Sequence, residues 1–164
     1  MKTAVILCTL FSLGLCDSLV RQCRQDWELG NGEKSCYKVV KLQTSWAQAY
    51  MWCTVLRSHL ADITSQFEQD SVADILKTKY SDYYEQFWID LSDMSTEGDW
   101  RLMTFNQNTT FTPWIQGQPN NYDQAENCAH INAKPERNFM WNDHNCQAQL
   151  NFICEAYPEE VYVD

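Results

Sequence analysis

The sequence predicts an α+β domain, with two helices, several short strands, a long irregular segment and three disulfide bonds. Three observations support this fold class. Two Ser-x-x-Gln/Glu patterns mark helix starts, short runs of β-branched and aromatic residues mark strands, and six cysteines lie outside an apolar N-terminal segment. The chain of 164 residues is long enough for one domain with a hydrophobic core.

The N-terminal segment has the features of a secretory signal. Lys2 provides a short basic start, an apolar run follows from Ala4 to Leu15, and small residues precede Asp17. The run is too short to span a bilayer, and no later run is long enough. We therefore expect a signal peptide at residues 1–16, a single mature domain at 17–164, and a secreted, extracellular protein without a membrane span.

The first element of the mature chain is expected to be a hairpin. Trp27 and the run from Tyr37 to Val40 flank residues 30–32, whose sequence Gly-Asn-Gly is typical of a turn. Cys23 and Cys36 lie on either side of this turn, where a disulfide bond would close the hairpin.

Two capping patterns predict two helices. Ser45 and Ser65 are each followed three residues later by Gln or Glu, a spacing that satisfies the free N–H groups of a helix start. We expect the first helix to continue to Leu56 and the second through Leu76. Residues 59–63 between them read as a short extended link.

The second half of the chain combines short strands with a long loop. Residues 87–91 read as a buried strand, and regular periodicity is then mostly lost over 92–127. A loop of this length in a compact domain is usually functional or disordered, and its aromatic residues argue against disorder. Short strands are expected at 128–131, 139–142 and 152–155.

The cysteine count favours disulfide bonds. Of eight cysteines, Cys8 and Cys16 lie in the expected signal peptide, which leaves six. An even number in a secreted chain implies three disulfide bonds, and their number alone allows fifteen pairings. The six are Cys23, Cys36, Cys53, Cys128, Cys146 and Cys154.

Charge and motifs exclude some functions. The net charge of −10 argues against nucleic-acid binding, which needs basic patches. It fits a cation-binding protein, and equally an ordinary soluble one. The sequence lacks the G-x-S-x-G, H-E-x-x-H and phosphate-loop motifs, so we expect no enzymatic activity.

Residues 118–128 read QPNNYDQAENC and carry many side-chain oxygens with no Lys or Arg among them. This stretch and three other motifs resemble segments of the C-type lectin-like domain, and the resemblance covers about residues 23–156. The family segments include its W-I-G-L strand, its E-G-x-W turn and its E-P-N or Q-P-D tripeptide. The corresponding segments are Trp88-Ile89-Asp90-Leu91, Glu97-Gly98-Asp99-Trp100, Gln118-Pro119-Asn120, Glu126-Asn127-Cys128 and Trp141-Asn142-Asp143.

The resemblance implies a particular form of the α+β fold. Two helices flank small antiparallel sheets, and a long irregular loop region carries the binding site. It also implies the pairings Cys23–Cys36, Cys53–Cys154 and Cys128–Cys146, and a cis peptide bond before Pro119.

The resemblance further implies a Ca²⁺ site that binds carbohydrate. Calcium prefers hard oxygen ligands, and sugar hydroxyls would bind both the ion and the side chains around it. The residues implied for both roles are Gln118, Asn120, Glu126, Asn142 and Asp143. The expected partners are therefore carbohydrates or the glycans of glycoproteins.

The tripeptide departs from the family pattern. Gln-Pro-Asn has two amides, whereas Glu-Pro-Asn, linked to mannose, and Gln-Pro-Asp, linked to galactose, each have one acid. We therefore expect weaker calcium binding and blurred sugar selectivity. Five residues without an inserted glycine separate Asn120 from Glu126, which favours mannose-type sugars.

We also expect two further sites, and we keep one alternative function. An auxiliary calcium site is implied at Asp93, Glu97, Asn121 and Asn127, and Asn108-Thr109-Thr110 is a sequon for N-glycosylation. The alternative is a calcium-independent protein of the same fold that binds ice, mineral or another protein.

Overall fold

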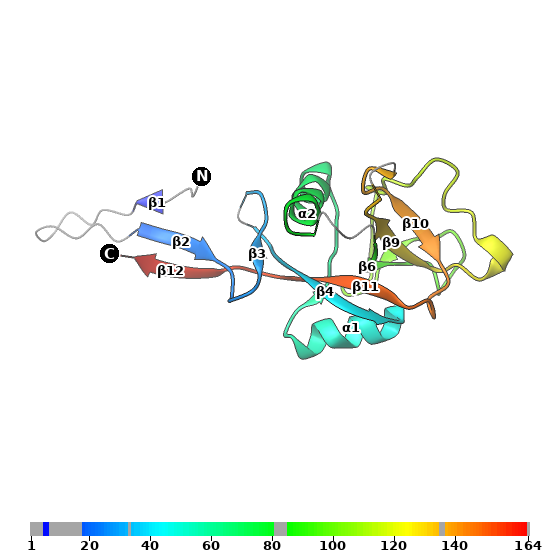
Figure 1. The fold of residues 1–164 in the computed structure, drawn as a ribbon, viewed down its shortest axis with the longest axis horizontal. Coiled ribbons are helices and arrows are strands. Elements are labelled where there is room, and N and C mark those ends of the chain that lie inside the picture. Colours follow the sequence, from blue (N-terminus) through cyan, green and yellow to red (C-terminus); the bar gives the residue numbers. More distant parts are fainter. Residues whose placement is uncertain (1–4, 7–17, 33, 81–84, 135–136, 164) are drawn as a thin grey trace, which may run out of the picture.

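The computed structural model describes residues 5–6, 18–32, 34–80, 85–134 and 137–163, and shows two helices on opposite faces of a twisted sheet (Figure 1). Helix α1 is Trp46–Val55 and helix α2 is Gln66–Lys79. The strands are β1 Val5–Ile6, β2 Ser18–Gln22, β3 Glu28–Leu29, β4 Cys36–Thr44, β5 His59–Leu60, β6 Gln86–Ser92, β7 Arg101–Leu102, β8 Gln107–Asn108, β9 Cys128–Asn132, β10 Trp141–His144, β11 Leu150–Ala156 and β12 Glu159–Val163, with a short 3-10 helix, η1, at Tyr122–Gln124.

The main sheet places strands that are distant in sequence side by side. Its order is β10-β9-β6-β11-β4-β3, and every pair is antiparallel except β6 and β11. The pairing of β3 with β4 confirms the expected hairpin. Because β9, β10 and β6 are neighbours, the two ends of the long loop meet at one edge of the sheet.

Both predicted helix starts are confirmed. The hydroxyl of Ser45 accepts the backbone N–H of Gln48 at 3.4 Å, and the hydroxyl of Ser65 accepts that of Glu68 at 3.3 Å. The second helix extends to Lys79, three residues beyond the predicted end at Leu76.

The core is divided between the two faces of the sheet. On the α2 side, buried helix residues such as Val72 and Leu76 join Ile131 and Trp141 of the sheet. On the α1 side, a second cluster surrounds Trp88, which is fully buried. Because both faces are covered, the sheet holds the strands that carry the site in fixed positions.

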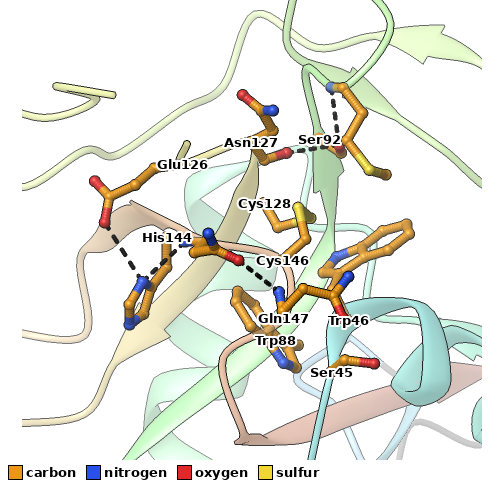
Figure 2. The surroundings of a disulfide bond; sticks show 12 residues. Ser45, Trp46, Trp88, Ser92, Glu126, Asn127, Cys128, His144, Cys146 and Gln147 are labelled. Carbon is orange, nitrogen blue, oxygen red and sulfur yellow. Dashed lines mark hydrogen bonds and ion pairs between the residues drawn. A yellow bond between two sulfur atoms is a disulfide. The ribbon is translucent and has the colours of Figure 1, made fainter. Parts of the chain in front are cut away.

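The three disulfide pairings implied by the family resemblance are confirmed. Cys23 is bonded to Cys36, Cys53 to Cys154 and Cys128 to Cys146. The third bond joins the start of β9 to the turn after β10 (Figure 2). It therefore closes the segment that carries Asn142 and Asp143.

Some features differ from the sequence-based expectations. Strand β10 begins at Trp141, because Phe139 adopts a positive φ of 59° that ends extended structure before it. Strands β7 and β8 lie inside the segment expected to be irregular. The pairing of β2 with β12 was not expected at all.

The expected signal peptide lies largely outside the described residues, apart from Val5–Ile6, and it stays a prediction. In the described part of the chain, no helix combines the length and the apolar character needed to cross a membrane.

Candidate cation site in the long loop

The loop between β6 and β9 is packed rather than free. The rings of Trp100 and Trp114 meet edge to face with centroids 4.8 Å apart, and Trp114 meets the buried Trp141 at 5.9 Å. Backbone hydrogen bonds of 2.8 and 2.9 Å join Ile115 and Pro113 to Trp141. The aromatic residues therefore fix the loop against the start of β10, in agreement with the expectation that this loop is not disordered.

The backbone between Asp93 and Asp99 forms a tight turn that is held by one carboxylate. Oδ2 of Asp93 accepts the backbone N–H of Gly98 at 2.8 Å. Gly98 has a φ of +77°, where any other residue would be strained. The turn fixes the position of Asp93, whose side chain is almost completely buried.

Asp143 is the centre of the candidate site. It lies on β10 with no exposed surface, and its Oδ2 accepts the backbone N–H groups of Asn120 and Asn121 at 3.0 and 2.7 Å. Its other oxygen, Oδ1, is buried and has no hydrogen-bond partner among the described residues. One carboxylate oxygen thus holds the loop, while the other is free to accept a ligand.

Gln118 presents a second unpaired oxygen. Its Oε1 is buried without a hydrogen-bond partner within the described part of the chain. The Gln118–Pro119 peptide bond is cis, as the resemblance implied. A buried acceptor without a donor is costly, so an oxygen of this kind needs a ligand that attracts its lone pairs.

Glu126 closes the loop on itself. Its Oε2 accepts the backbone N–H of Tyr122 at 3.1 Å, and its own N–H donates to Oδ1 of Asn121 at 3.1 Å. Burial raises the pKa of Glu126 above its ordinary value, and the nearby Asp143 adds to this effect. Two neighbouring carboxylates repel each other, and a cation bound between them relieves this repulsion.

Asn142 and two histidines complete the surroundings. The amide nitrogen of Asn142 lies 3.3 Å from Nε2 of His130 and also donates to the backbone carbonyl of Asp143. Burial lowers the pKa of His130 to about 4, so this imidazole is neutral at pH 7 and its Nε2 can accept the hydrogen bond. Because the amide nitrogen is used in this way, the carbonyl oxygen of Asn142 remains as a ligand.

Neither histidine was predicted from sequence. Nδ1 of His144 lies 3.4 Å from Oε1 of Glu126, close enough for an ion pair when the imidazole is protonated (Figure 2). Residues 130 and 144 are brought together by the pairing of β9 with β10, which places their rings 5.8 Å apart. No local motif marks them, so only the strand register could have found them.

The residues expected at the auxiliary site lie beside the main one. The backbone carbonyl of Asn127 accepts the N–H of Asp93 at 3.3 Å and the hydroxyl of Ser92 at 2.6 Å. Burial raises the pKa of Asp93, and the charge of Glu97 raises it further. Oδ1 of Asp93 is a third buried oxygen without a partner among the described residues. Asn121, in contrast, already uses its side-chain oxygen to accept the N–H of Glu126.

The donor atoms of the site determine which metal ion it can hold. The unpaired buried atoms of its expected ligands, on Gln118 and Asp143, are oxygens. Its acids are Glu126 and Asp143, and the other three expected ligands are amides. Hard oxygen donors of mixed charge are the ligands that calcium prefers, whereas zinc and copper prefer nitrogen or sulfur. The residues present therefore fit calcium.

Comparison with known proteins gives the same family. The family model for the C-type lectin domain matches residues 42–156. The chain is 34% identical over 159 residues to a mannose-binding C-type lectin isoform from Notechis scutatus scutatus, a match covering 94% of each chain.

Solved structures have the same fold. The carbohydrate-recognition domain of mouse scavenger receptor C-type lectin matches with a TM-score of 0.73 and 28% identity, covering 84% of this chain and all of that one. A calcium-independent type II antifreeze protein matches with a TM-score of 0.71 over 85% of this chain and 97% of that one, but its 24% identity shows the fold alone. The matching sequence motifs, the disulfide pairings and these relatives establish that the chain belongs to the C-type lectin family.

Proposed function

We propose that the protein is a secreted, calcium-dependent lectin without enzymatic activity, whose single domain binds glycans at the long loop. The observation that carries the proposal is the pair of buried, unpaired oxygens on Gln118 and Asp143. They come from a loop and a strand that are 25 residues apart in sequence, and both belong to the set of five expected ligands.

The remaining residues would support the same site. Glu126 is held by the N–H of Tyr122, and Asn142 is held by His130, so neither side chain has to be ordered at the moment of binding. Bound calcium would supply coordination positions for two sugar hydroxyls. The carboxylates would accept hydrogen bonds from these hydroxyls, and the side-chain amides would donate to them.

We further propose that mannose-type sugars are preferred. The short loop between Asn120 and Glu126 supports this preference, whereas relatives over nearly the whole chain are named both as mannose-binding and as galactose-binding isoforms. Tyr122 is 67% exposed near the site and could pack against a sugar ring. The two amides of the tripeptide remove one acceptor, so the preference over galactose should be modest.

Asn108 is proposed as an N-glycosylation site. Its side chain is exposed on β8, as attachment requires, and it lies in a sequon.

Sugar-resin binding tests the main proposal. The mature protein should bind immobilised mannose in calcium, elute with a chelator, and bind again when calcium is restored. Galactose resin should retain less protein. Retention that persists in the chelator would contradict the proposal.

One observation favours a second candidate function. With two amides in the tripeptide, the site has only two acids, and a protein of this fold is described as calcium-independent. A calcium-independent interaction protein would show the same binding with and without the chelator, so the resin experiment separates the two candidates.

A further inference from the structure

The two ends of the described chain form a ribbon that stands away from the domain. Strands β2 and β12 pair antiparallel over five residue pairs, from Gln22 opposite Glu159 to Ser18 opposite Val163. Figure 1 shows the ribbon at one end of the long axis, and the loop that carries η1 at the other. Tyr162 and Val163 are 71% and 42% exposed.

The ribbon leaves the outer edge of β12 open. Among the described residues, β12 pairs only with β2, so its second edge has unpaired backbone N–H and C=O groups. A two-stranded ribbon is marginally stable in water, and an open edge is a template for another strand. The β12 sequence Val161-Tyr162-Val163 has high strand propensity, and within β12 the only charges are Glu159 and Glu160, with no proline and no register shift against β2.

The sequence of β12 is suited to pairing with itself. In an antiparallel pair centred on Val161, Val161 faces Val161, Glu160 faces Tyr162 and Glu159 faces Val163. No acid then opposes an acid. A parallel, in-register pair would place Glu159 and Glu160 opposite their own copies, which is unfavourable.

The charge of the ribbon also permits this contact. Arg21 on β2 lies 3.2 Å from Glu160 and offsets one of the two acids within the same copy. Of the two acids of β12, Glu159 is then the one without this ion pair, and in the antiparallel pair it faces Val163.

We propose that β12 pairs with β12 of a second copy of this chain, about a two-fold axis at Val161, to form a four-stranded sheet. Isologous contacts of this kind give closed dimers. The contact uses the edge of β12 that faces away from β2. It does not involve β1, which pairs with the other edge of the ribbon and lies in the expected signal peptide.

The dimer has a consequence that rests on the proposed function. Because the ribbon and the long loop lie at opposite ends of the molecule, the two candidate cation sites would point away from each other (Figure 1). Such a dimer would cross-link separate glycans and raise avidity for a multivalent surface without any new sugar contact.

The first experiment measures oligomeric state with the full mature protein. Light scattering coupled to gel filtration, over a wide range of concentrations, should show a dimer. Val161→Glu places two acids opposite each other at the axis and should weaken the dimer by about tenfold or more. The matched control is Val55→Glu on α1, at a valine that is 67% exposed, which should leave the dimer intact.

A cross-linking experiment tests the register independently of stability. Val161→Cys would place two thiols directly opposite each other, and mild oxidation should join the two copies. Val163→Cys is the control, because its partner would be Glu159 and the two thiols would lie about 13 Å apart along the strands.

Each outcome decides the proposal. It is overturned if the wild type is a monomer at all concentrations, if Val161→Glu leaves the dimer unchanged, or if Val163→Cys cross-links as readily as Val161→Cys. Loss of the dimer in Val55→Glu alone would assign the contact to α1 instead. Sugar binding does not enter either readout, so failure of the proposed function would leave the result unaffected.

Discussion

Asn142 and Asp143 lie on β10, whereas Gln118, Asn120 and Glu126 lie in the loop before β9. The strand residues are positioned by sheet hydrogen bonds, with Asn142 opposite His130 and Asp143 opposite Ala129. The loop residues have no such ladder. The N–H of Asn120 donates to the carboxylate of Asp143, that of Gln118 to the carbonyl of Ile115, and that of Glu126 to the side-chain oxygen of Asn121.

A residue of the site can bind the cation, hold the loop in place, or do both, and Asp143 is expected to do both. Gln118 is expected to act only as a ligand, because its Oε1 has no hydrogen-bond partner among the described residues. Asp143 is expected to bind the cation through Oδ1 and to hold the loop through Oδ2. A change at Asp143 should therefore affect both the ion and the loop, whereas a change at Gln118 should affect mainly the ion.

The largest effect is expected from Asp143→Asn. It removes one of the two acids and weakens the hydrogen bonds that hold the backbone of Asn120 and Asn121. Calcium affinity measured by calorimetry should fall by about 100-fold or more. Amide hydrogen exchange at residues 120 and 121 should become faster, even without calcium.

The matched control for this change is Asp123→Asn, at an exposed acid of the same loop. It should change calcium affinity little. If Asp143→Asn left the affinity unchanged, the strand would not contribute a ligand and the comparison between the two halves would fail.

The next effect comes from the disulfide bond between Cys128 and Cys146, which supports the strand half. It closes a loop with a sequence separation of 18 residues, so replacing both cysteines with alanine should cost about 3 kcal/mol of unfolding free energy. Calcium affinity should fall as well, because β10 loses the bond that fixes its end.

The pair Cys23 and Cys36 provides a control of similar size. Its sequence separation is 13 residues, so its removal should lower the unfolding free energy by a similar amount, about 3 kcal/mol. It lies in the hairpin away from the site, and calcium affinity should be unchanged. Equal losses of affinity in the two double variants would show that the strand half is not specially supported.

A smaller effect of opposite sign is expected from Gln118→Glu in the loop half. The change restores an acid without altering side-chain length, and calcium should bind about tenfold more tightly. It also restores an acceptor for a sugar hydroxyl, which should increase mannose binding. Glu126→Gln should act in the opposite direction.

Gln116→Glu is the control for Gln118→Glu. Gln116 is exposed two residues earlier in the same loop, so this variant adds the same charge without adding a ligand. If both variants tighten calcium binding equally, the gain comes from the added negative charge of the loop, and Gln118 is not a ligand.

Features that depend on local sequence could be predicted, and those that depend on packing could not. The helix starts at Ser45 and Ser65 depend on local hydrogen bonds, so their patterns were sufficient. The cis bond at Pro119 and the disulfide pairings followed from the resemblance. The expected ligands on the loop and on β10 could be named from motifs, but which oxygen is free and which is bonded depends on packing.

Features that depend on distant pairing were missed. His130 and His144 approach the site only because β9 pairs with β10, and Val161 meets Val20 only because the two ends of the chain run side by side. No local pattern encodes such contacts. For the same reason, sequence could place Asn121 near an auxiliary site but not show that its side-chain oxygen already accepts the N–H of Glu126.

The smallest effect is expected at the auxiliary site. Asp93 uses Oδ2 to hold Gly98 and leaves Oδ1 buried without a partner among the described residues, the same division of labour as in Asp143. If a second calcium ion binds there, calorimetry of the wild type should give two ions per chain. Asp93→Asn should then give one, with the affinity of the main site reduced only a few-fold, about 1 kcal/mol or less.

The matched control is Asp99→Asn, because Asp99 is paired with Arg101 at 2.9 Å and should not contribute a ligand. A wild type that binds a single ion, with Asp93→Asn indistinguishable from it, would show that Asp93 serves the turn alone and that only the Asp143 side of this region holds calcium.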